Sequence, residues 1–273
     1  GATLTEFLTA SGVDFSVAED VNTYEDIAER ITYGTVGISI GAAWIFGGKF
    51  IKRFQGRLVN LHGARLPQDR GGGGFSWRIM RNDRIGLSLI HQVDEGVDTG
   101  QILVYEEYFF PHSCRVPADY REYALQKNLE LIDRFVDDAL AGRDFQSLSQ
   151  PEYLSSYWPR LHTDTHGYIG WDWKLEDIER FVCAFDDPYA GAITFVNDRK
   201  VRIKNCLSSL SDGMFHPFQT GIVYKITGAA LFVAAGDGSL VVRDVFDENG
   251  VNVTLDIRVG DRFETPVEYL EEA

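Results

Sequence analysis

The sequence predicts an α/β protein in two parts, a mostly parallel sheet covered by helices and then a small antiparallel β-barrel or sandwich. Two observations predict this division. Helical and strand-like patterns alternate through residues 1–110, which is typical of a parallel sheet. After residue 190, short apolar runs are separated by Gly and Asp turns, which is typical of antiparallel strands. A content of 44% hydrophobic and 25% charged residues is that of a globular protein.

In the first part, apolar residues at helical spacing and short apolar runs alternate along the chain. The spacing predicts helices over 4–10, 24–31, 51–54 and 120–141. The apolar runs predict strands over 35–40, 57–61, 85–92 and 101–108. Gly142 is placed to end the longest helix.

The second part follows a polar, turn-rich stretch that we interpret as a linker over 155–170. An amphipathic helix is predicted over 175–185. Strands are predicted over 192–196, 200–208, 221–226, 231–235 and 240–245. The expected organisation is therefore a first domain over 1–154, the linker, and a C-terminal helix plus barrel over 171–273.

Charge restricts the class of partner. The chain has 41 acidic and 26 basic side chains, a net charge of −15, which opposes binding to a long phosphate backbone. We therefore expect no large nucleic acid as partner, although a few local arginines can still hold one small anion. No apolar run has the length of a membrane span. Three widely spaced cysteines form no disulfide framework, so a reducing compartment, the cytoplasm, is expected.

Polar residues gather after two predicted strands. Asn60 and His62 alternate with Leu61, so both side chains point to one face of the sheet. The loop 94–100 follows another strand and carries Asp98. An amide, an imidazole and a carboxylate at such a position can supply an oxyanion donor, a proton carrier and an orienting anion. The alternative interpretation is that His62 is a structural histidine.

The sequence supports neither a phosphate-binding loop of the P-loop type nor a metal site. The glycine run 71–74 is similar to a phosphate-binding loop, but no Lys-Ser/Thr pair follows it. His62, His91, Asp94 and Asp98 are metal-ligating residue types, but their spacing matches no metal motif, so no metal is expected.

The segments 60–67, 70–71 and 94–100 resemble the signature of the formyltransferases that use 10-formyltetrahydrofolate. Segments 158–160, 170–173 and 184–192 resemble the junction and second domain of methionyl-tRNA formyltransferases. The resemblance implies a Rossmann-like first domain and an OB-like C-terminal barrel. Because that fold starts with a strand–helix–strand unit before the helix at 4–10, we expect this chain to lack the unit.

The resemblance makes Asn60, His62 and Asp98 the catalytic residues. Asn60 and a protonated His62 would donate hydrogen bonds to the oxyanion formed when a primary amine attacks the formyl carbon. Asp98 would orient His62 and favour its charged form.

The resemblance also implies two ligand sites. The donor, 10-formyltetrahydrofolate, would lie between two loops that comprise Trp44, Ile45, Phe46, Ile90, Gln92, Val93 and Asp94. The acceptor would meet residues near the glycine run, namely Arg65, Arg70, Phe75 and Trp77.

Three amine acceptors are compatible with the family: a nucleotide-linked amino sugar, initiator methionyl-tRNA and glycinamide ribonucleotide, although the enzymes that act on the last usually lack the barrel. A nucleotide-linked amino sugar, a precursor of surface polysaccharide, is favoured because the chain is acidic. Initiator methionyl-tRNA is the first alternative, supported by the second domain. Hydrolysis of 10-formyltetrahydrofolate, with water as the acceptor, and binding without turnover remain further alternatives. A homodimer is compatible with the sequence.

Overall fold

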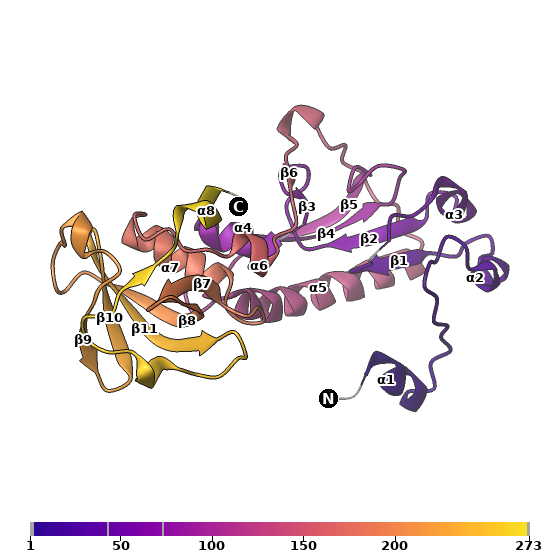
Figure 1. The fold of residues 1–273 in the computed structure, drawn as a ribbon. Coiled ribbons are helices and arrows are strands. Elements are labelled where there is room, and N and C mark those ends of the chain that lie inside the picture. The colour runs from indigo at the N-terminus through magenta and orange to yellow at the C-terminus, as the bar shows by residue number, and fades with distance from the viewer. Residues whose placement is uncertain (1–2, 43, 73, 272–273) are drawn as a thin grey trace.

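Two sheets lie toward opposite ends of the molecule in the computed structural model, and a long helix, α5 (Pro117–Leu140), runs along the N-terminal one (Figure 1). The structure describes residues 3–42, 44–72 and 74–271, so Gly73 of the glycine run lies outside the described residues. None of the described helices has the length and hydropathy needed to cross a membrane.

The first sheet has the strand order β1-β2-β4-β5. Its strands are β1 (Gly37–Ile40), β2 (Leu58–His62), β4 (Ile85–Gln92) and β5 (Ile102–Phe109). β1 and β2 are parallel and are connected through α3 (Gly48–Arg53). β2 is antiparallel to β4, and β4 is antiparallel to β5. The prediction of a mostly parallel sheet is therefore wrong for the described strands.

The path of the chain between β2 and β4 explains the difference. A parallel return needs a crossover element that packs on the sheet. Instead, α4 (Gly74–Met80) packs mainly against α5 and α7 (Leu175–Ala184), and Arg78 on α4 donates to the Ile85 carbonyl at the start of β4 (Figure 1). The chain therefore re-enters the sheet from the far end and runs antiparallel to β2.

The N-terminal segment contributes little to the core. α1 (Leu4–Ala10) begins at a capping box formed by Thr3 and Glu6, and none of its described residues is buried. The alternating apolar residues over 13–17 form no strand in the described chain, and α2 (Glu25–Arg30) follows. Packing against the first sheet begins with Val21, Ile27 and Ile31, which contact the cluster around Phe50 and Phe54.

The second sheet is antiparallel, as predicted, with the order β12-β7-β8-β11-β10-β9. Its strands are β7 (Ala192–Val196), β8 (Arg199–Ser209), β9 (Val223–Thr227), β10 (Ala230–Ala235), β11 (Gly238–Asp247) and β12 (Phe263–Glu264). The sheet curls into a half-barrel. Backbone hydrogen bonds between 221–223 and 260–263 bridge its open side.

The segment predicted as a linker is structured. It contains β6 (Tyr157–Trp158), which pairs in parallel with β3 (Arg70–Gly71), and the short helix α6 (Thr163–His166). This pairing places the segment against the glycine run of the first part.

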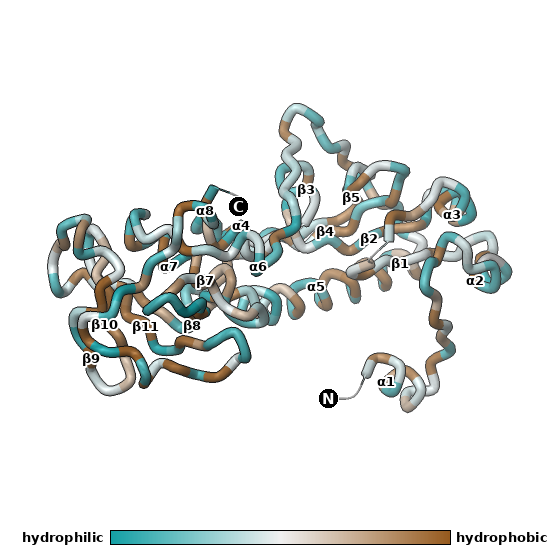
Figure 2. Tube along the Cα trace, in the orientation of Figure 1, coloured by the Kyte–Doolittle hydropathy of each residue, from teal (hydrophilic) through white to brown (hydrophobic). Residues whose placement is uncertain are grey.

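A continuous apolar core joins the two halves. Phe110 and Tyr120 belong to the same buried cluster as Ile178, Val182 and the barrel strands. Figure 2 shows the same arrangement as hydrophobic segments along the strands of both sheets, with hydrophilic connections outside. The remaining short elements are 3₁₀ turns at Glu152–Leu154, Pro217–Gln219 and Thr254–Asp256, and the helix α8 (Val267–Glu271).

Candidate active site

A cross-strand pair forms the centre of the site. Asn60 on β2 lies opposite His91 on β4, and Asn60 Nδ2 is 3.2 Å from His91 Nε2. His91 Nδ1 lies 2.7 Å from the backbone oxygen of Gln92. Because a carbonyl oxygen only accepts, Nδ1 carries the hydrogen, and Nε2 accepts a hydrogen bond from the Asn60 amide. This contact fixes the Asn60 amide and leaves its second N–H for a ligand.

Asp98 lies beside both histidines. Its Oδ1 is 3.7 Å from His62 Nδ1 and 3.8 Å from His91 Nε2. The two imidazole rings meet edge to face, with centroids 5.9 Å apart. The structure therefore brings Asn60, His62 and Asp98 together around His91, which the sequence had named only as a candidate metal ligand.

The same cluster has the composition of a metal site. The ligating atoms of His62, His91 and Asp98 lie within 4.8 Å of one another. However, the Asn60 amide already occupies the lone pair of His91 Nε2. A metal ion would have to displace that hydrogen bond.

Burial controls the charge of both imidazoles. It lowers the pKa of His62. The Asp98 carboxylate and the Asp69 backbone carbonyl raise that pKa, whereas the nearby His91 and Arg78 lower it further. Burial likewise lowers the pKa of His91, against the Gln92 carbonyl and Asp98. Asp98 acts on His62 in the expected direction, but desolvation is the larger cause. His62 is therefore neutral rather than protonated at neutral pH.

The loop that carries Asp98 has a tightly defined backbone. Asp98 has a φ of +54°, in the left-handed region that few residues other than glycine adopt. Asp94 Oδ1 accepts hydrogen bonds from the Gly96 backbone N–H at 3.1 Å and from Thr99 Oγ1 at 2.5 Å. A Cβ at Gly100 would lie 1.8 Å from the backbone oxygen of Gln92, so only glycine fits there.

A smaller cavity, about 110 Å³, lies on one side of the cluster. It is lined by Ser39, Ala42, Trp44, Ile45, Phe46, Asn60, His91, Val93, Asp94, Gly96, Val97 and Asp98. Trp44 donates its indole N–H to the Glu19 carbonyl at 2.7 Å, which holds the ring. The Ser39 hydroxyl is buried and has no hydrogen-bond partner among the described residues, as expected of a group kept for a ligand.

Two residues predicted for the folate site do not line this cavity. Ile90 is fully buried in the core beneath β4, and the Gln92 amide donates to the Gly56 carbonyl at 3.1 Å. The structure corrects their expected positions. Side chains alternate along a strand, so the one between them, His91, faces the cavity.

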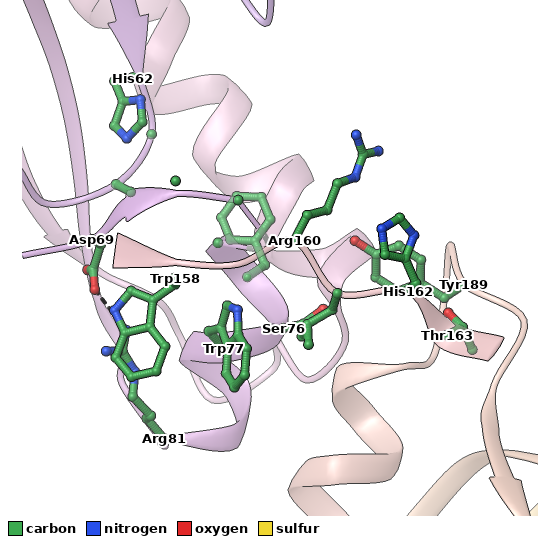
Figure 3. A pocket seen from close by; sticks show the side chains of 17 residues that line it. His62, Asp69, Ser76, Trp77, Arg81, Trp158, Arg160, His162, Thr163 and Tyr189 are labelled. Atoms are coloured by element: carbon green, nitrogen blue, oxygen red, sulfur yellow. Dashed lines mark hydrogen bonds and ion pairs between the residues drawn. The ribbon is translucent and has the colours of Figure 1, made fainter. Parts of the chain in front are cut away.

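A larger cavity, about 640 Å³, lies on the other side and reaches the second half of the chain (Figure 3). It is lined by His62, Gly63, Ala64, Asp69, Gly71, Gly72, Gly74, Phe75, Ser76, Trp77, Arg81, Trp158, Arg160, Leu161, His162, Thr163 and Tyr189. His62 Nε2 and Trp158 Nε1 are buried here without a hydrogen-bond partner in the described chain. Both atoms are available to a polar ligand.

Aromatic and basic side chains form one wall of the larger cavity. The rings of Trp77 and Trp158 lie 5.2 Å apart, and the Arg81 guanidinium lies 4.8 Å from the Trp158 ring centroid. Arg160 lines the same cavity (Figure 3). Of the four residues predicted for the acceptor, Phe75 and Trp77 line this cavity.

Arg65 and Arg70 lie elsewhere, which corrects their expected position. Arg65 pairs with Asp83 at 2.6 Å, and Arg70, nearly buried, pairs with Glu152 at 2.8 Å. Arg81 and Arg160 take their place along the cavity. The segment 158–160 was noticed in the sequence, but only the pairing of β6 with β3 brings it here.

Sequence comparison identifies relatives of both halves of the chain. Residues 22–126 match the family described as "Formyl transferase", and residues 162–256 match "Formyl transferase, C-terminal domain". The methionyl-tRNA formyltransferase of Syntrophus aciditrophicus is 30% identical over 197 residues, which cover 70% of this chain and 59% of that protein. The corresponding enzyme of Acetivibrio thermocellus is 26% identical over 202 residues, covering 72% and 62%. The chain thus spans about three fifths of the length of these relatives.

Solved structures share the fold. The sugar 3N-formyltransferase WlaRD superposes with a TM-score of 0.68 at 16% identity, covering 91% of this chain and 82% of that one. An N-formyltransferase from Helicobacter canadensis has a TM-score of 0.66 at 15% identity, covering 89% and 83%. At these identities the likeness extends to the fold alone.

Proposed function

The chain belongs to the formyl transferase family, and on that premise we propose that it transfers a formyl group from 10-formyltetrahydrofolate to the amino group of a nucleotide-linked sugar. One observation carries the proposal. Asn60 and Asp98 line the smaller cavity, whereas His62 lines the larger one. A formyl donor in one cavity and an amine in the other would therefore meet at these three side chains.

The smaller cavity, with a volume of about 110 Å³, suits the heteroaromatic ring of the folate rather than the whole molecule. Its aromatic residues, Trp44 and Phe46, offer flat apolar faces to a heteroaromatic ring, and the unpartnered Ser39 hydroxyl offers a polar contact. Val93 and Asp94 add backbone groups from the loop that also carries Asp98. The solved relatives are described with 5-N-formyltetrahydrofolate and folinic acid, which supports a folate as the formyl donor.

Each reactive residue has a separate role in the proposed transfer. The donor supplies a formyl carbon, which the amine attacks. The free N–H of Asn60 stabilises the developing oxyanion. Neutral His62 accepts the amine proton at Nε2, its unpartnered nitrogen, and returns it to the departing folate nitrogen. Asp98, 3.7 Å from Nδ1, stabilises the imidazolium between these two transfers.

The larger cavity suits a nucleotide-linked sugar. Its volume of about 640 Å³ is in the range of small-molecule sites. The Trp77 and Trp158 rings offer a stacking surface for a base, and Arg160 and His162 offer donors to a diphosphate. The Helicobacter canadensis relative is described in complex with dTDP-3-aminofucose, which supports this acceptor class.

Methionyl-tRNA is the second candidate because the relatives found by sequence carry that name. A net charge of −15 disfavours it, since binding to tRNA depends on basic surface.

An acceptor competition tests the proposal. Purified protein is incubated with 10-formyltetrahydrofolate and, separately, with dTDP-, UDP- or GDP-linked amino sugars or with methionyl-tRNA, and folate release is measured. We expect release that depends on one nucleotide sugar. Arg160→Ala should raise the KM for that sugar about tenfold or more, as expected for a lost charged contact, and leave kcat nearly unchanged.

Arg143→Ala provides the matched control, because Arg143 is an exposed arginine paired with Asp138 at 2.7 Å. Release that depends on methionyl-tRNA would favour the second candidate. Release without any amine would indicate a hydrolase, and folate binding without release would indicate a protein that only binds.

A further inference from the structure

Gln150 holds the backbone of the loop that carries Asp98. Its side-chain amide nitrogen donates to the Asp98 carbonyl at 2.9 Å and to the Gly100 carbonyl at 2.7 Å. Leu148, two residues earlier, forms a pair of backbone hydrogen bonds with Ile102 at the start of β5. The chain segment is therefore anchored beside the loop, and both N–H groups of Gln150 are used on it.

Arg70 fixes the orientation of this amide. One guanidinium nitrogen donates to Gln150 Oε1 at 3.1 Å, so the oxygen of the amide faces Arg70 and its nitrogen faces the loop. A second nitrogen donates to the exposed Glu152 carboxylate at 2.8 Å. Arg70 is also a residue of β3, whose next residue, Gly71, lines the larger cavity.

These contacts matter because Asp98 has a disfavoured backbone conformation. A non-glycine residue at a φ of +54° persists only where its surroundings determine it. Rotation of this residue would move the carboxylate away from His62 Nδ1, which is already 3.7 Å from Oδ1. The two hydrogen bonds from Gln150 constrain the carbonyl of Asp98 itself and that of the residue two positions later.

We propose that Gln150 is a positioning residue, which, oriented by Arg70, holds Asp98 against His62 and ties the catalytic loop to the wall of the larger cavity. The inference rests on the proposed function. Gln150 lines neither cavity, and Arg70, which is nearly buried, does not line the larger cavity proposed for the acceptor. The proposal therefore assigns a role in the reaction to two residues that contact neither ligand.

Gln150→Met tests the proposal, because methionine keeps the length of the side chain, is neutral and donates no hydrogen bond. Glu152→Gln is the matched control, since it removes the negative charge that faces Arg70 and leaves the loop contacts intact. Three quantities are measured for each variant: kcat for formyl transfer, the pKa of His62 by NMR titration of its imidazole, and the melting temperature. The groups that face His62 are Asp98 and the Asp69 backbone carbonyl, which raise its pKa, and His91 and Arg78, which lower it.

We expect Gln150→Met to reduce kcat about ten- to a hundredfold, the size of effect that a small displacement of a reactive group produces. We also expect the pKa of His62 to fall below the wild-type value, because the carboxylate that raises it has moved away. Glu152→Gln should keep both quantities at the wild-type level. This combination of results would show that Gln150 positions Asp98, because a general loss of stability would not selectively change the pKa of one histidine.

An unchanged His62 pKa in folded Gln150→Met would overturn the proposal, as would an equal loss of kcat in Glu152→Gln. If Gln150→Met does not fold, Gln150→Ala is measured in the same way, and failure of both to fold would show a purely structural role and overturn it. If the wild-type protein transfers no formyl group to any acceptor, the proposed function fails. The His62 titration still decides the role of Gln150 in that case.

Discussion

His62 and His91 lie beside the same carboxylate but differ in their free hydrogen-bonding atoms. His91 uses both ring nitrogens, one on the Gln92 carbonyl and one on the Asn60 amide. His62 has Nδ1 toward Asp98 and Nε2 without a partner in the described chain. Only His62 can therefore exchange a proton with a ligand, while His91 keeps the Asn60 amide in place.

Replacement of His62 tests this difference. His62→Ala should reduce kcat by about 10² to 10⁴, the range for loss of a general base, while the far-ultraviolet circular dichroism stays that of the wild type. His112→Ala, at an exposed histidine, should leave kcat unchanged. A His62→Ala variant with a normal rate would remove this residue from the mechanism.

The pH dependence of the rate should report the His62–Asp98 contact. Burial lowers the pKa of His62 below its usual 6.5, and Asp98 opposes that shift. Because the neutral form is the base, the rate should fall as pH drops through the His62 pKa. Asp98→Asn removes the group that raises the pKa, so the acidic limb of the kcat/KM profile should move to lower pH and the maximal rate should fall. Superimposable acidic limbs would contradict the coupling.

At the scale of elements, the loop between β4 and β5 determines whether the reactive groups converge. Its backbone is held by Asp94, by the tight contact at Gly100 and by Gln150. β4 and β5 supply rigid ends, because β4 is buried between β2 and β5. The site thus depends on a short loop anchored at both ends.

A methyl group at Gly100 tests that dependence. Gly100→Ala would place Cβ 1.8 Å from the Gln92 oxygen, so the loop must shift. We expect a loss of about 1 to 3 kcal/mol in the free energy of unfolding, typical of overpacking, together with a large loss of kcat. Urea denaturation and steady-state kinetics measure the two effects.

Gly236→Ala is the control, because a Cβ there meets nothing within 4 Å. If Gly100→Ala and Gly236→Ala have the same free energy of unfolding and the same kcat, the close contact at Gly100 affects neither quantity.

At the scale of the whole molecule, the two halves share their core and one cavity. α7 packs against α4 on one side and against β8 and β11 on the other. The Ser76 hydroxyl on α4 donates to the Ala184 carbonyl at the end of α7 at 2.8 Å. The larger cavity is lined from both halves, so its shape depends on this packing.

Truncation of Ile178 tests the shared core. This residue is fully buried on α7, and Ile178→Ala should lower the free energy of unfolding by about 2 to 5 kcal/mol. Because the core is continuous, calorimetry should show a single unfolding transition for the variant, at a lower temperature than for the wild type. Two transitions, only one of which moves, would contradict a shared core.

Leu255→Ala is the control, because Leu255 is 83% exposed, and the change should be within about 0.5 kcal/mol of the wild type.

Most elements could be predicted from local pattern. α1, β4 and β7 have the predicted bounds, and α7 and the barrel strands β8 to β11 lie within a few residues of the prediction, whereas β12 was not predicted. The direction of β4 could not be predicted, because side chains alternate with the same period in parallel and antiparallel strands. β3 and β6 were missed because a two-residue pairing between distant segments has no periodicity.

The sequence by itself determined the family, the antiparallel second half, and the amide, imidazole and carboxylate that its motifs contain. The tertiary structure alone decided which groups touch them. His91 lies opposite Asn60 because β4 runs antiparallel to β2, and Gln150 reaches Asp98 because its segment pairs with the start of β5. It also decided which arginines face the cavity: Arg81 and Arg160 line it, whereas Arg65 pairs with Asp83 and Arg70 with Glu152. Local pattern reports the character of each side chain, whereas its partners depend on long-range packing.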